Sequence, residues 1–458
     1  MNGRKIIALT FGLLSSILLL AAPSSAQAAF SSGSTGADGA LSPTASIVLQ
    51  IPESGVFNYT TVNIPYGAIV TFSKNSANTP VTILATGDVT IGGTIDVSGS
   101  IGTQLIPGKG GPGGFEGGRG GALGSASGRG QGIGGGEPGT SDGTANGYAG
   151  GGGGGSFWIA GNAGSTNNTS FPGGAGGSTY GNLTLLPLLG GSGGGAGGSN
   201  ISYVGPAGGG GGGAILIASS GTINVAGQIF AKGGNGTSSY IMYGGGGSGG
   251  AIRLIANTIS GNGTISAVGG YASGSAGKGG DGRVRLETFT MTRTATTTPV
   301  YSFALPTSVT PPNMPVLSIT KVGGIAVPAV PSGTYGSLDV TLPFNTVNPV
   351  SIEISGANIP VGTTVTAVVA PEVGAVTTAT GTLSGTDAAS TAAVQLTLSK
   401  AYPSIISIST TFVLTASNGA PFYVNGEKVE RVRVSSVMGG GSSVIYITES
   451  GKEIPAGV

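Results

Sequence analysis

The 458-residue sequence contains no cysteine and no histidine, and only 8% of its residues are charged. The absence of cysteine excludes disulfides and thiolate nucleophiles. Without histidine the chain lacks the side chain used most often for general acid–base catalysis. The net charge of +1 gives no electrostatic attraction to nucleic acid or to an anionic membrane. We therefore expect a non-catalytic protein with no nucleic-acid partner.

Long apolar runs are confined to the N-terminus. Arg4 and Lys5 precede an apolar run over residues 6–22, and Ala26-Gln27-Ala28 provides a small-residue cleavage site. This order is typical of a secretory signal peptide, which we assign to residues 1–28. No later apolar stretch has the length of a membrane-spanning helix. We expect a mature protein without a membrane span that is secreted or held on the outer cell surface.

Glycine is the abundant residue, with 94 copies, about one in five against an average of about 7%. In residues 101–213 it fills 47 of 113 positions, so glycine motifs for phosphate binding arise there by chance. The P-loop requires Ser or Thr after Gly-Lys, whereas Lys109 and Lys278 are each followed by glycine. The calcium-binding β-roll repeat is not matched either, because Asp96 and Asp281 stand at the wrong spacing. We expect neither a cofactor nor a metal ion.

An internal repeat organises the first half of the chain. Residues 214–234 align with residues 251–270 at an offset of 36 to 37, and residues 283–287 continue the series. Residues 81–99 are the same unit about 134 positions upstream of its counterpart. Repeats of short alternating strands bury their apolar face by stacking on one another. The pattern predicts an all-β fold with a parallel β-helix, a solenoid, over residues 29–287.

The repeat units themselves resemble a known family. Residues 81–99, with Gly-Gly-Ala-Ile-Leu-Ile from Gly212 and Gly-Gly-Ala-Ile-Arg-Leu from Gly249, are similar to glycine-rich parallel β-helix proteins exported by Gram-negative bacteria. The similarity covers about residues 35–287. It implies a secreted or cell-surface location in a Gram-negative bacterium, and it transfers no catalytic residues.

Residues 101–213 form a glycine-rich insert within that predicted solenoid. The six glycines at 208–213 come directly before the first strand of the next coil, which indicates re-entry into the solenoid. Extended glycine segments can pack closely and exchange backbone hydrogen bonds, so we favour an ordered glycine layer. The alternative is a loose insert, because ordering each glycine costs conformational entropy. Tyr148, Phe157 and Trp158 then act as packing residues or form a glycan-binding face.

Charged candidates for a site are few. Arg253 and Arg285 occupy matching positions on successive coils, and the alternation of their neighbours predicts outward side chains that form a small basic ladder. We favour a solvated face for this ladder over contact with an acidic polysaccharide or other cell-surface component. Asp88 and Asp96 lie on neighbouring strands and are the best local carboxylate pair for glycoside hydrolysis, but we prefer the alternative that they are solvated turn and strand-edge residues. A lyase or hydrolase is therefore our least favoured hypothesis, after a structural or adhesive protein and a glycan-binding module.

The C-terminal third is poorer in glycine. Residues 288–315, rich in Thr and Pro, predict an extended linker. Regularly spaced apolar segments then predict an immunoglobulin-like β-sandwich over residues 316–458, ending in a hairpin with Asn425-Gly426 at its turn. The strands are expected near residues 316–319, 338–342, 350–354, 364–369, 394–398, 406–414 and 444–447.

Overall fold

The structure, a computed structural model, describes residues 29–76, 78–144, 148–166, 170–240, 242–306, 309, 315–328, 331–413, 423–424, 427–436 and 442–455. Within these ranges every regular element is a β-strand, which confirms the predicted all-β class. These ranges contain no candidate for a membrane-spanning helix. The predicted signal peptide and the predicted turn residues Asn425 and Gly426 lie outside the described residues.

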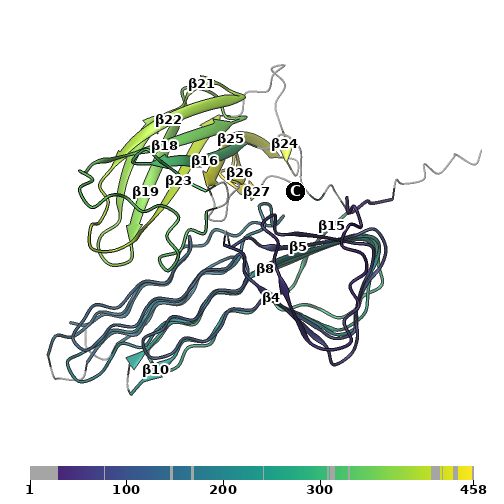
Figure 1. Ribbon diagram of the computed structural model, residues 1–458, viewed down its shortest axis with the longest axis horizontal. Coiled ribbons are helices and arrows are strands. Elements are labelled where there is room, and N and C mark those ends of the chain that lie inside the picture. Colours follow the sequence, from purple (N-terminus) through teal and green to yellow (C-terminus); the bar gives the residue numbers. More distant parts are fainter. Residues whose placement is uncertain are drawn as a thin grey trace, which may run out of the picture.

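Two parallel sheets occupy the first part of the chain (Figure 1). One has the order β1-β4-β7-β9-β13, with bounds β1 (Ile47–Gln50), β4 (Ile69–Ser73), β7 (Thr94–Asp96), β9 (Gln228–Phe230) and β13 (Thr264–Ser266). The other has the order β15-β14-β12-β8-β5-β2, and β3 and β6 extend it, because β6 also pairs with β8. Its strands are β2 (Val56–Tyr59), β3 (Val62–Ile64), β5 (Val81–Ala85), β6 (Val89–Ile91), β8 (Ala214–Val225), β12 (Ala251–Ser260), β14 (Arg283–Met291) and β15 (Ser302–Ala304).

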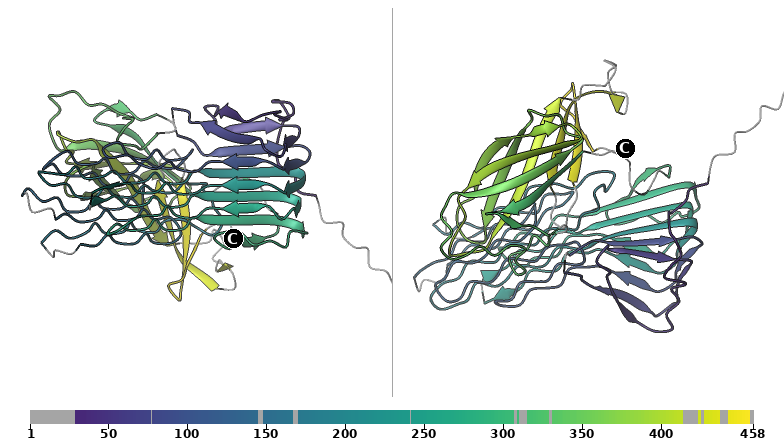
Figure 2. Two further views of the ribbon diagram at one scale, coloured as in Figure 1. Left: turned by 90° about the horizontal axis from the view of Figure 1, so that it is seen from below. Right: turned by 45° about the horizontal axis from the view of Figure 1, so that its top comes forward.

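The register of these strands follows the sequence repeat. Ile252 on β12 lies opposite Ile215 on β8, at the predicted offset of 37 residues. Ile217 on β8 lies opposite Ile83 on β5, at the predicted offset of 134. Chain segments far apart in sequence are therefore direct neighbours in one sheet, as the left view of Figure 2 shows. The glycine-rich insert separates two strands that pair with each other.

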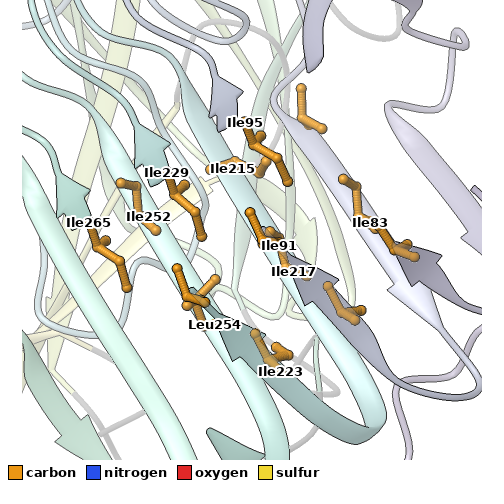
Figure 3. Close-up of a cluster of buried hydrophobic side chains, with 14 of the residues drawn as sticks. Ile83, Ile91, Ile95, Ile215, Ile217, Ile223, Ile229, Ile252, Leu254 and Ile265 are labelled. Carbon is orange, nitrogen blue, oxygen red and sulfur yellow. The ribbon is translucent and has the colours of Figure 1, made fainter. Parts of the chain in front are cut away.

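Columns of aliphatic side chains fill the space between the two sheets (Figure 3). In one sheet Ile229 lies between Ile95 and Ile265, and all three are at most 1% exposed. Ile229 therefore faces the interior, as expected for a repeat that buries its apolar face by stacking. Each such side chain contributes roughly 1.5–3 kcal/mol by leaving water, so the columns are the main stabilising feature of this part.

The glycine-rich segments pack side by side as extended chains, mostly without regular strands (Figure 1, lower left). Backbone amides bridge remote segments: Gly208 donates to Gly118 O, Gly209 donates to Gly245 O, and Gly245 donates to Gly195 O, with N···O distances of 2.8–3.0 Å. We call these segments the glycine layer; its described residues come from 99–213, 232–250 and 267–282. The ordered form of the insert is therefore present in the structure.

Close approach of backbones explains the composition of the glycine layer. A Cβ atom added at Gly247 would overlap Gly210 O, and a Cβ added at Gly210 would overlap Lys109 O. At Gly143 an added Cβ meets nothing within 4 Å. Most positions in the glycine layer resemble Gly247, so glycine is required there by contact distance. A short antiparallel pair, β10 (Ser238–Ser239) and β11 (Met242–Tyr243), lies within this region.

Two antiparallel sheets form the C-terminal part (Figure 2, right). One has the order β17-β16-β18-β22-β21: β16 (Val316–Val322), β17 (Ile325–Ala326), β18 (Val350–Ala357), β21 (Ser384–Thr386) and β22 (Ala389–Leu396). The other has the order β20-β19-β23-β25-β26-β27, with β24 on β25: β19 (Thr364–Pro371), β20 (Thr377–Thr382), β23 (Ser404–Val413), β24 (Tyr423–Val424), β25 (Glu427–Ser436), β26 (Ser442–Thr448) and β27 (Glu453–Pro455). A second apolar cluster includes side chains of both sheets.

Two sequence predictions differ from the structure. Residues 338–342 contain no strand, although the alternation Leu-Asp-Val-Thr-Leu predicts one; Asp339 instead accepts hydrogen bonds from the backbone amides of Ser332 and Gly333. Part of the predicted linker 288–315 is regular, because β14 runs to Met291 and β15 pairs in parallel with it. The chain therefore leaves the parallel sheet later than its Thr/Pro content indicates.

The C-terminal part contacts the glycine layer directly. Arg119 Nε lies 3.2 Å from Glu372 Oε1, and Arg129 donates to Gly374 O at 3.0 Å. The amide of Tyr335 donates to Gln131 Oε1 at 3.1 Å. These contacts connect the two parts through polar groups.

Candidate functional site

Arg253 and Arg285 lie opposite each other on β12 and β14, as their matching positions predict. Their predicted exposure is wrong: Arg253 is 1% exposed and Arg285 is 4% exposed. The insert and the predicted linker cover this face, where Leu183 and Val309 contact the two guanidinium groups. Glu287, which lies two residues after Arg285 on the same face of β14 and is itself fully buried, compensates their charge. The two arginines therefore form no accessible ladder for an acidic glycan.

Glu287 holds both guanidinium groups. Arg253 donates from Nε to Oε1 at 2.8 Å and from Nη2 to Oε2 at 3.2 Å, and Arg285 Nε donates to Oε1 at 2.6 Å. Burial alone would raise the pKa of Glu287, but the hydrogen bonds and charges of the two arginines hold that pKa below its usual value. The carboxylate is thus kept ionised in a dry environment.

The same arginines cross-link separate segments. Arg285 Nη1 donates to Leu183 O at 3.2 Å, in the insert, and Arg253 Nη1 donates to Val309 O at 3.0 Å, in the predicted linker. A buried charge is tolerated when it is paired and fully hydrogen-bonded. The arrangement therefore fixes the insert and the linker to the outer face of the parallel sheet, and its role is structural.

Arg283, at the start of β14, differs from these two. Its guanidinium carbon lies 4.1 Å from the centroid of the Trp158 ring, within the range of a cation–π contact. Its Nε atom is buried without a hydrogen-bond partner, and among the described residues no carboxylate pairs with it. Burial, and then the charge of Arg285, lower the pKa of Arg283. Arg283 therefore supplies an uncompensated cation beside the indole ring.

The aromatic candidates divide into packing and surface residues. Phe157 is 1% exposed and meets Tyr180 edge-on, with ring centroids 5.1 Å apart, so it is a packing residue. Trp158 is partly exposed and contacts the same cluster, which includes Leu185 and Leu189. Tyr148 is 45% exposed and forms no ring contact with Trp158 within the described part of the chain. Trp158 is thus a surface aromatic that pairs with a charged side chain, Arg283.

The Trp158–Arg283 pair has a defined chemical capability. Guanidinium donors bind carboxylates, and a partly exposed indole offers apolar area to the CH face of a sugar ring. Three arginines, Arg253, Arg283 and Arg285, lie here with one carboxylate, Glu287. The local net charge is positive and favours an anionic ligand. The pair therefore fits an acidic sugar better than a neutral one.

The carboxylates considered for hydrolysis serve the local backbone. Asp88 Oδ1 accepts from Thr222 N at 2.7 Å, and Asp96 Oδ1 accepts from Ser98 N at 2.8 Å. These are the strand-edge and turn roles that the alternative hypothesis assigns to them. In the described ranges no three residues among His, Cys, Asp and Glu are grouped to hold a metal ion.

Sequence reasoning missed Glu287 as the partner of both arginines and Arg283 as the partner of Trp158. The spacing Arg-Leu-Glu over 285–287 carries a signal for the first, because residues two apart on a strand share a face. Nothing in the sequence brings Trp158 to β14, since 125 positions separate it from Arg283. No family model matches the chain, and neither a curated protein nor a solved structure shows significant similarity to it.

Proposed function

We propose that this protein is a non-catalytic, exported structural or adhesive component of a bacterial cell surface or extracellular matrix. The observation that carries the proposal is the glycine layer, in which backbone hydrogen bonds join segments far apart in sequence. Such a layer has few side chains that react or titrate, and each of its segments is fixed by several neighbours. These are properties of a durable scaffold.

The proposed architecture is a parallel β-helix followed by an immunoglobulin-like sandwich. Parallel pairing at offsets of 37 and 134 residues supports the first, since each added coil places its isoleucines on those of the coil before. Two antiparallel sheets with a shared apolar cluster support the second. In this arrangement the solenoid carries the glycine layer, and the sandwich acts as a spacer or docking unit.

Export is tested by fractionation. Cells that express the full-length chain are separated into cytoplasm, outer membrane and medium, and N-terminal sequencing of the recovered protein locates the cleavage site. We expect mature protein beginning near Ala29 in the medium or on the outer membrane. Uncleaved protein found in the cytoplasm would contradict the proposal.

A scaffold role is tested by loss of function. Deleting the gene should reduce attachment to a surface or the mechanical cohesion of the matrix, and the wild-type gene should restore both. Release of oligosaccharides from a panel of bacterial polysaccharides by the purified protein would instead establish an enzyme, and new unsaturated ends among the products would identify a lyase.

Glycan binding is the second candidate function, and the Trp158–Arg283 contact favours it. Polygalacturonate should bind the protein more tightly than neutral galactan, because Arg283 lacks a carboxylate partner in the described part of the chain. Trp158→Ala and Arg283→Gln should each weaken binding at least about tenfold. Tyr66→Ala is the matched control, since Tyr66 is 96% exposed. Equal affinity for the acidic and neutral polymers would refute this function.

A further inference from the structure

A cavity of about 760 Å³ lies in the C-terminal part. Its walls come from β16, from the first residues of β18 and β23, and from the irregular segment between Pro331 and Asn348, with Ile133 of the glycine layer at one side. Most of the lining is apolar and includes the side chains of Ile319, Val340, Leu342, Leu398 and Ile406. This volume lies within the range of natural small-ligand sites, roughly 300–1,000 Å³.

The irregular segment that covers the cavity is the one in which residues 338–342 do not form the predicted strand. Two backbone amides donate hydrogen bonds to the Asp339 carboxylate within this segment. Tyr335 Oη donates a hydrogen bond to Ala370 O at 2.9 Å, which fixes the segment to β19. Its apolar side chains are nevertheless exposed: Leu338 by 57% and Phe344 by 98%. An apolar rim around an apolar cavity indicates a binding site rather than a packing defect.

Two polar groups on one connection give the cavity a direction. Ser404 Oγ is buried and has no hydrogen-bond partner among the described residues. Lys400, four residues earlier, lines the cavity, is exposed, and forms no ion pair within the described ranges. Asp339 also lines the cavity, but its carboxylate is already bound by two backbone amides. The end of the cavity formed by the β22–β23 connection therefore favours an anionic group.

We propose that this cavity binds the chain of a free long-chain carboxylate, with the apolar chain inside and the carboxylate at Lys400. A peptide strand would bring amide groups into the apolar interior, where unpaired polar groups are costly. An acyl chain brings none, and burying its CH₂ groups removes apolar surface from water. The proposal does not depend on the scaffold or glycan functions proposed above.

The test is calorimetric titration of the intact mature protein with dodecanoate and with dodecanol. We expect both to bind and the carboxylate to bind more tightly. Lys400→Gln should weaken dodecanoate binding about two- to fivefold, as for an exposed ion pair, and should leave dodecanol binding unchanged. Lys278→Gln is the matched control, because Lys278 is exposed and lies in the glycine layer away from the cavity.

The cavity itself is tested by filling it. Ile406→Trp should abolish binding of both compounds. Leu338→Asp, at the exposed rim, should weaken binding of both and replaces the first variant as the test if Ile406→Trp does not fold. Circular dichroism confirms that each variant is folded. No binding of either compound to the wild-type protein, or unchanged binding by folded Ile406→Trp, would overturn the proposal. Association with anionic phospholipid vesicles without binding of free dodecanoate would also overturn it.

Discussion

Replacing Glu287 by glutamine tests whether the buried arginine cluster stabilises the fold. The substitution keeps the size of the side chain but removes the one negative charge that holds Arg253 and Arg285. Three charge-assisted hydrogen bonds of 2.6–3.2 Å lose the charge of their acceptor. In addition, an NH₂ group replaces one carboxylate oxygen, and its N–H donors face the donors of a guanidinium. Both arginines would remain buried without a counter-charge.

The expected loss is large. Breaking a buried ion pair by removing one partner costs about 3–5 kcal/mol, because a desolvated charge is left uncompensated. An exposed pair is worth about 0–1 kcal/mol. Lys321 and Glu353 form such a pair, with 3.0 Å between Nζ and Oε2 and both side chains almost half exposed. Glu353→Gln is therefore the matched control.

Urea unfolding followed by tryptophan fluorescence measures the difference. Trp158 is the only tryptophan in the chain, and it contacts Arg283 on the strand that carries Glu287, so its emission reports on this region. A loss by Glu287→Gln of less than about 1 kcal/mol, comparable to the control, would refute the reasoning. Acid adds a second readout. Because the folded pKa of Glu287 lies below the unfolded value of 4.5, its contribution is complete above that pH and is lost as pH falls towards the folded pKa. Glu287→Gln should flatten that part of the pH profile.

Three further predictions concern the core, the glycine layer and a partly buried lysine. Ile229→Ala should destabilise the parallel sheets by about 2–5 kcal/mol in urea unfolding, whereas Ile69→Ala, at a side chain 44% exposed, should cost much less; equal losses would contradict the inward position of Ile229. Gly247→Ala should cost about 1–3 kcal/mol and speed amide exchange in residues 208–213, while Gly143→Ala should change both little; exchange of 208–213 within seconds in the wild type would show that the layer is loose. Burial lowers the pKa of Lys74 from 10.5 to about 8, so between these pH values the unfolded chain binds more protons than the folded chain. The free energy of unfolding should therefore rise with pH from about 8 towards 10, and Lys74→Met should remove that rise. Parallel plots of unfolding free energy against pH for the wild type and Lys74→Met would disprove the prediction.

The parallel part was predictable because its repeat consists of recognisable side chains. Ile215 and Ile252, and likewise Ile229 and Ile265, recur at fixed offsets. Stacking these isoleucines on one another is enough to set the register of the strands. The glycine layer was predictable in outline only. Its pairings depend on backbone contacts, and runs of glycine carry no side-chain signal that sets the register.

The C-terminal part and the charged residues were predicted less well. The alternation at 338–342 predicts a strand, but Asp339 binds the preceding turn, and that local interaction leaves the segment irregular. Arg253 and Arg285 follow the alternation of an outward face, yet the insert and the linker cover that face. A strand pattern distinguishes the two faces of a sheet, and it cannot indicate that a distant segment covers the second face.

The place of the insert between β5 and β8 has a consequence for folding. Closing the β5–β8 pair spans 134 residues, against 37 for β8–β12, and the longer loop costs about 1 kcal/mol more in chain entropy. The strands before residue 97 pair with one another over 23 to 27 residues, and β8 pairs with β12 over 37, so both groups of strands close at a lower entropy cost than the pairing between them. The pairing across the insert is therefore the costliest in the parallel part, and the glycine layer, whose segments come from the insert and from the coils after it, is completed only when that pairing forms.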